Sequence, residues 1–556
     1  MRRREGIWAC AATVLWPSAI SFAASKSASR IADAPQPLTH ANYKIEVIGQ
    51  PSVMHGIQGL AIGPDGAIYA GSLTGGSIYR IDIASGAVTT FLGPPRGGAD
   101  DLAFAPNGAI FWTGLGSGNV LTRGKDGRVR TLAQDMPGAN AVGFSRDGRL
   151  FVSRIFGGDG LYELDPAGVK PRRTVAEQIG GLNAFQIGDD GGLYGPLFHL
   201  GKIVRIDIET GAMTDIADGF ESPSAVKIEA DGKLIALDYL RGEVVRVDPK
   251  SGEKAAIAKL PPPVDNLAIG KDGTIYVSST AYNGITAIDP KTLAQRRVTW
   301  GDFSAPGLLT VLDGEESEEL LVADIWGPRI FDPSTGESRL IKRMPGVLGA
   351  TSIVAHGKTY ILGIAGGSSS GSVQVVERAT GRLLANYINF GTPYDIKPIA
   401  DGVVVADYSV GRLTKIGNDE HHTRTIYAWD FDGPVGLADA GNGALYVSEY
   451  RGGRITRVDP KTNDQDVVID GLKAPEGIAL GSDGRLIVAE VGRKRVIAVD
   501  TATRTAQILA DNLAIGPVGG SQTQAPSLPT GVALGKSGAI YVTSDIANVI
   551  YRLTPP

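Results

Sequence analysis

The chain has 556 residues, of which 43% are apolar, and a formal net charge of −5. This length exceeds what one hydrophobic core usually serves, so two domains are expected, and the apolar content excludes a disordered chain. The acidic balance argues against a nucleic-acid-binding protein, which needs a basic surface to contact phosphates. The 75 glycines follow no Gly-X-Y period and therefore indicate many tight turns instead of collagen.

The N-terminus has the features of a secretory signal peptide over residues 1–24. Three consecutive arginines precede an apolar stretch that is short for a membrane span, and small residues near Ala23 offer a cleavage site. An uncleaved anchor is the alternative. The only cysteine, Cys10, lies in this segment, so the mature chain has no disulfide and no thiol ligand. We expect a periplasmic or secreted protein with no membrane span, preceded by a flexible lead-in over residues 25–42.

A repeat of roughly 40 residues organises the rest of the sequence. Each unit contains a short apolar run, an Asp-Gly or Asn-Gly turn, a second apolar run and a phrase close to I-x-R-I-D. GLAIGPDGAIYAGSLTGGSIYRIDIASG at 59–86 is one copy, and GLADAGNGALYVSEYRGGRITRVDPKT at 436–462 is another. The position just before the first apolar run recurs at steps of 40 to 44 residues, except for a last step of 54 that contains a Gly/Pro/Gln-rich insert.

Each unit divides into four runs of high strand propensity, and none shows a long helical period. Dipeptides such as Asp65-Gly66 and Asn107-Gly108 predict hairpin turns between the first two strands of a unit. Four short antiparallel strands per unit are typical of β-propeller blades, and twelve units exceed the usual number in one ring. The sequence therefore predicts an all-β fold of two tandem six-bladed β-propellers of four-stranded antiparallel blades, over residues 43–292 and 293–556.

The sequence is compatible with two forms of ring closure. The last unit ends at Pro556, directly after its third strand, and therefore lacks an outer strand. An unpaired outer edge favours aggregation and is expected to be filled. In the favoured two-clasp form, the strand 43–49 completes the sixth blade and the strand 294–300 completes the twelfth. In the single-clasp form, 43–49 pairs with the last blade instead, and one seam closes both rings.

The recurring reference position is expected at the mouth of the central channel, because the inner strand of a blade begins at the channel rim. All six first-ring residues carry side-chain oxygens, whereas half of the second-ring residues are apolar, which supports the division and predicts different roles. Oxygen ligands without cysteine suit a hard cation such as calcium or magnesium. Alternatively, the side chains of such residues form hydrogen bonds with the backbone of nearby turns. The positions are Gln58, Asp100, Asn140, Asn183, Ser224 and Asp265, then Pro306, Ala350, Tyr394, Val435, Glu476 and Thr530.

Three phrases carry a family resemblance: PEGIALGSDGRLIVAE (475–490), PTGVALGKSGAIYVTS (529–544) and VDNLAIGKDGTIYVSS (264–279). They resemble the SMP-30/gluconolactonase and strictosidine synthase-like superfamily, with NHL-repeat and virginiamycin B lyase-like propellers nearby. The resemblance covers nearly the whole mature chain and implies the propeller fold. That superfamily includes metal-dependent lactonases, esterases, a lyase, a condensing enzyme and binding modules, so the fold does not select an activity.

In gluconolactonase-like propellers, carboxylate and amide side chains at the starts of inner strands hold a divalent cation. The resemblance implies that role for Asn140, Asn183 and Asp265, with Asp100 as a further ligand or general base. Gln58 stands where the family usually has a glutamate, which removes one negative charge. Without a cation, Asp100 and Asp265 would repel each other and one of them would hold a proton.

Loops on the same face supply further candidates. His199 lies between the second and third strands of the fourth unit and is a candidate general acid or base. Alternatively, His199 is an exposed loop histidine without a catalytic role. This is the interpretation that we favour for His55. Aromatic and cationic loop residues suit an organic, anionic substrate, or else pack between blade edges. The candidate substrate-binding residues are Gln58, Ser224, Arg154, Tyr239, Arg241 and Tyr282.

These expectations favour an exported metal-assisted hydrolase of the lactonase or esterase type. A divalent cation, with calcium expected, would polarise a substrate carbonyl at the first mouth, and Asp100 or His199 would move the proton. One alternative is a non-catalytic scaffold that binds a ligand, or a protein partner through its acidic and aromatic second mouth. Another is a lyase similar to virginiamycin B lyase, which the scarcity of histidines makes less favoured.

Overall fold

The computed structural model describes the chain over 37–40, 42–313, 318–341, 349–365, 371–418, 423–516 and 528–556. The expected signal peptide, residues 1–24, lies outside these ranges. In the described part of the chain, strands form twelve antiparallel sheets, and the helices are two single 3-10 turns, η1 (Thr280–Tyr282) and η2 (Val491–Arg493). None of the helices described there has the length and apolar character to cross a bilayer. The all-β class predicted from the sequence is confirmed.

Six of these sheets make up the first propeller, with four strands in each. Its strands are β3 (Ile57–Ile62), β4 (Ile68–Ser72), β5 (Ser77–Ile81), β6 (Val88–Leu92), β7 (Leu102–Phe104), β8 (Ile110–Gly114), β9 (Asn119–Arg123), β10 (Val129–Ala133), β11 (Ala139–Phe144), β12 (Leu150–Arg154), β13 (Gly160–Leu164), β14 (Arg173–Glu177), β15 (Gln186–Ile187), β16 (Gly192–Leu197), β17 (Lys202–Asp207), β18 (Met213–Ala217), β19 (Pro223–Ile228), β20 (Leu234–Asp238), β21 (Glu243–Val247), β22 (Lys254–Lys259), β23 (Val264–Ile269), β24 (Ile275–Ser279), β25 (Gly284–Ile288) and β26 (Gln295–Thr299).

The other six sheets make up the second propeller, which also takes two strands from the start of the chain. Its strands are β1 (Leu38–Thr39), β2 (Lys44–Ile48), β27 (Pro306–Asp313), β28 (Glu318–Asp324), β29 (Arg329–Phe331), β30 (Ser338–Leu340), β31 (Ala350–His356), β32 (Thr359–Ile364), β33 (Gly371–Glu377), β34 (Leu383–Phe390), β35 (Pro393–Ile399), β36 (Gly402–Asp407), β37 (Arg412–Gly417), β38 (Arg424–Trp429), β39 (Pro434–Gly441), β40 (Ala444–Glu449), β41 (Arg454–Val458), β42 (Gln465–Ile469), β43 (Pro475–Leu480), β44 (Arg485–Glu490), β45 (Arg495–Asp500), β46 (Thr505–Asp511), β47 (Val532–Leu534), β48 (Ile540–Ser544) and β49 (Val549–Thr554).

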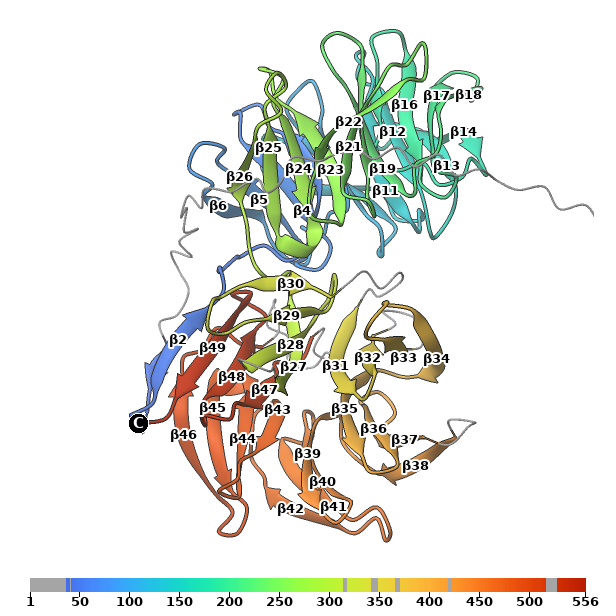
Figure 1. Ribbon diagram of the computed structural model, residues 1–556. Helices are drawn as coiled ribbons and strands as arrows, with labels where there is room; N and C mark the ends of the chain where they lie inside the picture. The colour runs from blue at the N-terminus through green and yellow to red at the C-terminus, as the bar shows by residue number, and fades with distance from the viewer. Residues whose placement is uncertain are drawn as a thin grey trace, which may run out of the picture.

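Each propeller is a closed ring, because its first and last inner strands are neighbours. In the first ring β3 contacts both β7 and β23, and in the second ring β27 contacts both β31 and β47. Figure 1 shows the first propeller, in blue to green, above the second, in yellow to red. The predicted fold of two tandem six-bladed β-propellers is confirmed.

The hairpin turns predicted from Asp-Gly dipeptides are present. Gly66 has a φ of +80°, a conformation that favours glycine, and its N–H donates to the Gly63 carbonyl over 2.9 Å. Asp65 supports the same turn by accepting the N–H of Ala67 over 3.2 Å. The turn sets Ile62 of β3 opposite Ile68 of β4, which is the pairing that directs apolar side chains between the blades.

The hydrophobic core consists of layers between neighbouring blades. Ile235 and Leu237 of β20 belong to one buried cluster with Ile275 and Val277 of β24, in the next blade. Burial of each such aliphatic side chain contributes roughly 1.5–3 kcal/mol. Because every blade packs against two others, the rings are rigid supports for the loops at their mouths.

The ring closure is the single-clasp form, so the favoured two-clasp prediction is wrong. β2 pairs antiparallel with β49 and supplies the missing outer strand of the twelfth blade. β26 stays with β25 in the sixth blade. The described part of the chain therefore begins in the second propeller, crosses to the first over 49–56 and returns to the second over 300–305. Part of the expected flexible lead-in is also ordered, since β1 pairs with β46.

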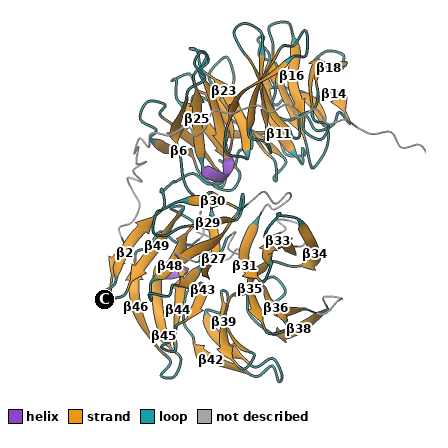
Figure 2. Cartoon of the chain, viewed as in Figure 1, coloured by secondary structure: helices purple, strands orange, loops and turns teal. Residues whose placement is uncertain are grey.

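The propellers meet through loops of both mouth faces, near η1 (Figure 2). Trp326 in the loop after β28 donates its Nε1–H to the Thr74 hydroxyl over 3.2 Å. His55 is only 4% exposed, and its Nε2 lies 2.6 Å from the Asp545 carbonyl oxygen. The interpretation of His55 as an exposed loop histidine is therefore wrong, because this loop is covered by the second propeller. Burial lowers the pKa of His55.

Candidate functional site

Acidic and amide side chains from different blades line the central channel of the first propeller at its mouth, which we call the first mouth. Asp100, Asn140 and Asp265 form its floor. Asn140 in β11 donates its Nδ2–H to the carboxylate of Asp100, which precedes β7. Both side chains are buried, and Oδ1 of Asn140 has no hydrogen-bond partner in the described part of the chain. A buried acceptor oxygen without a donor is costly unless a cation or water satisfies it.

Asp265 in β23 adds a second carboxylate to this floor. Burial raises the pKa of Asp100 well above its usual value, and the charge of Asp265 raises it further. Burial and the charge of Asp101 raise the pKa of Asp265 to about 7. Among the described ion pairs, neither Asp100 nor Asp265 has a basic partner within 4.0 Å. Because no basic side chain in the described chain pairs with them, these two acids favour the protonated, neutral form unless a cation binds beside them.

A second buried polar layer accompanies this floor. Asp101 accepts hydrogen bonds from Asn266 Nδ2 over 3.0 Å and from the Val142 N–H over 3.2 Å. Burial raises the pKa of Asp101, and the charge of Lys227 opposes part of this rise. Lys227 itself donates to the Phe185 carbonyl over 3.0 Å. The sequence reasoning missed this layer. Its signal was a polar residue directly after the reference positions in the second and sixth units.

Aromatic side chains from the loops of the same face form a rim beside the floor; they are Phe156, Phe198 and Tyr239, together with the ring of His199. Phe198 contacts Tyr239, Phe156 and His199 edge-to-face, with ring centroids 6.1, 5.8 and 5.6 Å apart. Burial raises the pKa of Tyr239, and the charges of Asp265 and Asp100 raise it further, so this phenol faces the acidic floor. His199 and Phe156 are exposed. Exposed His199 is thus linked to the carboxylates of the floor through the rings of Phe198 and Tyr239.

Three other reference residues of this ring already have protein partners. Gln58 accepts the Leu73 N–H over 3.2 Å, and Asn183 Oδ1 accepts the N–H of Ala184 over 2.8 Å. Ser224 is fully buried and donates to the Val264 carbonyl over 3.2 Å. These side chains therefore form hydrogen bonds with the backbone of their own or adjacent blades. This is the alternative role that the sequence allowed for such residues.

The remaining predicted substrate-binding residues are spread around the face. Arg154 donates to the carbonyls of Pro137 and Gly157 over 2.9 and 2.8 Å. Arg241 is exposed and forms an ion pair with Glu221 at 3.6 Å.

Tyr282 stacks on Trp300 with ring centroids 4.7 Å apart. The guanidinium of Arg329, from the second propeller, lies 4.9 Å from the centre of the Tyr282 ring. Tyr282 therefore belongs to the propeller junction.

The donor set at the first mouth fits a hard cation in type. Two carboxylates and an unpartnered amide oxygen are the ligands that calcium and magnesium prefer. No group of three or more His, Cys, Asp or Glu in the described ranges is arranged to hold a metal. A bound cation would therefore need the amide oxygen and water in addition to Asp100 and Asp265.

The second mouth holds a different cluster. The rings of Tyr394, Tyr408 and Tyr450 follow one another edge-to-face, with centroids 5.4 and 6.1 Å apart. Glu476 is fully buried, and burial together with the charge of Asp545 raises its pKa to about 8. Its Oε1 and the hydroxyl of Tyr450 have no hydrogen-bond partner among the described residues. Residues 517–527, within the insert expected from the sequence, lie outside the described ranges.

Known structures with similar architecture are propellers of low sequence identity. The chain is a β-propeller protein. No protein-family model matches the sequence, and no curated protein is significantly similar to it. A streptogramin B lyase structure is 19% identical, over 51% of this chain and 97% of its own length, with a TM-score of 0.38. Virginiamycin B lyase from Staphylococcus aureus is 16% identical, over 52% and 98% of the two chains, with a TM-score of 0.36.

A longer match is the extracellular domain of a putative hybrid two-component system from B. thetaiotaomicron. It is 11% identical, over 92% of this chain and 83% of its own length, with a TM-score of 0.32. At these identities the similarity concerns the fold alone, and function has to be argued from the sites.

Proposed function

We propose that the first propeller is an exported, metal-assisted hydrolase of small esters or lactones. The observation that carries this proposal is the first-mouth floor, where the carboxylates of Asp100 and Asp265 lie beside the unpartnered Oδ1 of Asn140. Buried carboxylates without basic partners are stable either as neutral acids or beside a cation. Their oxygen chemistry favours calcium over a transition metal.

Each residue of the first mouth has a role in this proposal. Asp100, Asp265 and Asn140 Oδ1 would hold the cation, which when bound supplies a Lewis acid for the substrate carbonyl. The amide of Asn140 orients the Asp100 carboxylate through their hydrogen bond. Tyr239 covers the floor and limits the access of water. His199, exposed beside Phe198, would transfer the proton between substrate and solvent.

The test combines metal content, calcium affinity and hydrolysis. We expect calcium in the purified protein by elemental analysis and hydrolysis of an aryl-ester and lactone panel that chelation abolishes. Asp265→Asn should lower both calcium affinity and kcat/KM by at least about a hundredfold. Asp272→Asn, which changes an exposed turn carboxylate of the same blade, should alter neither. Wild-type protein that neither binds calcium nor hydrolyses any substrate of the panel would contradict the proposal.

A second candidate function, ligand binding without catalysis, is supported by the second mouth. Three tyrosine rings and two carboxylates, with a buried Glu476 oxygen and a Tyr450 hydroxyl both unpartnered in the described chain, suit a small organic cation. Titration calorimetry with choline tests this function. Binding that Glu476→Gln weakens at least about tenfold would support it, and identical binding by this variant would contradict it.

A further inference from the structure

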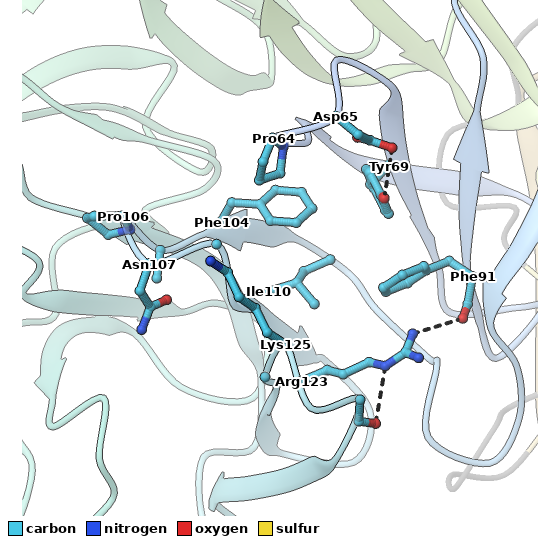
Figure 3. Close-up of a pocket in the computed structure, with 14 residues that line it drawn as sticks. Pro64, Asp65, Tyr69, Phe91, Phe104, Pro106, Asn107, Ile110, Arg123 and Lys125 are labelled. Carbon is cyan, nitrogen blue, oxygen red and sulfur yellow. Dashed lines mark hydrogen bonds between the residues drawn. The ribbon is translucent and has the colours of Figure 1, made fainter.

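A pocket of about 510 Å³ lies between the first and second blades of the first propeller. It is lined by turns that join β3 to β4, β7 to β8 and β9 to β10. In an antiparallel blade these turns lie at the opposite end from the loops of the mouth, so the pocket is on the other face of the propeller. Figure 3 shows the rings of Tyr69, Phe91 and Phe104 around it, with Arg123 and Lys125 along its lower edge.

Arg123 occupies a position that the other five blades of this ring fill with an aliphatic side chain. It pairs with Ile110, the first residue of the second strand of its blade. The corresponding position of every other blade packs into the layer between blades and is at most 5% exposed. Those residues are Ile81, Leu164, Ile206, Val247 and Ile288. An arginine at this position places a charge where the repeat otherwise builds its core.

The guanidinium of Arg123 is held in place but not neutralised. Its Nε and Nη1 donate to the carbonyls of Gly127 and Phe91, each over 3.2 Å, and its Cζ lies 4.4 Å from the centre of the Phe91 ring. These bonds use two of its five N–H donors. In the described part of the chain, no carboxylate lies within ion-pair distance of Arg123 or Lys125. The fixed orientation leaves the remaining donors available to an anion.

The acidic side chain at the pocket is already paired. Asp65 accepts the Nε–H of Arg80 over 2.7 Å. Arg80 in turn lowers the pKa of Asp65, so this carboxylate stays ionised and bound to its own partner. The pocket therefore has a positive balance from Arg123 and Lys125, in a chain whose overall net charge is −5.

The opposite wall is aromatic. The Tyr69 ring contacts Phe91 and Phe104 edge-to-face, with both centroid distances at 5.0 Å. These rings present flat apolar surface, and the pocket volume lies within the range of small-molecule sites. A planar apolar body would pack against the rings while its acid group meets the guanidinium.

We propose that this pocket binds a small aromatic carboxylate, independently of the first mouth. The carboxylate pairs with the free donors of Arg123, Lys125 adds charge attraction, and the ring of the ligand packs against Tyr69 and Phe104. Arginine suits this role because its planar donors match a carboxylate with two hydrogen bonds.

The test uses 2-naphthoate as the probe, with binding to the full chain followed by fluorescence or calorimetry. Arg123→Ile should weaken binding by at least about tenfold, and Lys125→Ala by about threefold. The variant Arg123→Ile should fold, because isoleucine stands at this position in three other blades. Lys233→Ala, which removes a cation from a turn of the fifth blade on the same face, should bind 2-naphthoate as the wild type does.

The neutral analogue 2-naphthylmethanol provides the second measurement. It should bind at least about tenfold more weakly than 2-naphthoate, because only the acid pairs with the guanidinium. Ester hydrolysis at the first mouth should be unchanged in Arg123→Ile. Equal affinity of the acid and the alcohol, or equal binding of 2-naphthoate by wild type and Arg123→Ile, would overturn the proposal.

Discussion

The side-chain amide nitrogen of Asn140 donates a hydrogen bond to the carboxylate of Asp100, which lies 40 residues earlier and one blade away. This bond fixes which end of the Asn140 amide faces Asp100. The other end, Oδ1, is buried and has no partner in the described chain. The pair therefore presents oxygens of two kinds, one carboxylate and one amide, to the same floor at the first mouth.

Asp265→Asn is expected to stabilise the cation-free protein at high pH. The folded-state pKa of Asp265, about 7, lies above that of the unfolded chain, so ionisation between about pH 4 and pH 7 destabilises the folded state. Asparagine does not ionise, so the variant does not lose this stability as the pH rises. In EDTA, urea unfolding should show the variant more stable than wild type at about pH 8 and similar at about pH 4.

Calcium should reverse this order at about pH 8, because wild type gains binding energy that the Asp265→Asn variant lacks. The same ranking with and without calcium would contradict the assignment of Asp265 as a ligand.

Glu476→Gln should reduce the dependence of the second propeller's stability on pH. Burial and the charge of Asp545 raise the Glu476 pKa to about 8, so wild type loses stability as pH rises from about 5 to about 8. Chemical denaturation at several pH values measures this slope. Glu337→Gln, an exposed change in the same propeller, should leave the slope as in wild type. A slope that Glu476→Gln does not reduce would show that other groups carry the dependence.

Arg329→Met is expected to destabilise the protein by about 3–5 kcal/mol. Arg329 and Asp324 form an ion pair at 3.0 Å, and both side chains are fully buried at the propeller junction. Loss of the guanidinium leaves the Asp324 carboxylate buried without its cation. Arg339→Met is the matched control, because Arg339 pairs with Glu319 on the surface and its loss should cost at most about 1 kcal/mol. Similar losses in both variants, measured by urea unfolding, would rule out this account.

Removal of residues 1–48 should loosen the twelfth blade and leave the sixth intact. β2 is the hydrogen-bonding partner of β49, with Val47 opposite Tyr551 and Glu46 opposite Arg552. Hydrogen exchange should become faster in β48 and β49, while β25 and β26 keep their protection. A chain that starts at residue 43 serves as the control. Faster exchange in β26 instead would point to the two-clasp closure.

The blade repeat could be predicted because its determinants are local. An Asp-Gly turn such as Asp65-Gly66 and the alternation of apolar residues in the following strand specify each hairpin, and adjacent hairpins then pack in chain order. The reference position also led to Asp100, Asn140 and Asp265, which the structure brings to one floor. The same pattern could not separate them from Ser224 and Asn183, whose polar groups bond to nearby backbone.

The sequence by itself determined the strands, the turns and the number of blades, since these depend on residues a few positions apart. Only the tertiary structure decided the closure, the burial of His55 and the pocket at Arg123. Strand 44–48 can pair with either free edge in principle, and the choice depends on the path of the two crossing segments. His55 and Arg123 acquire their surroundings from residues far away in the chain, such as Asp545 and Phe91, whose approach follows from how blades and propellers pack.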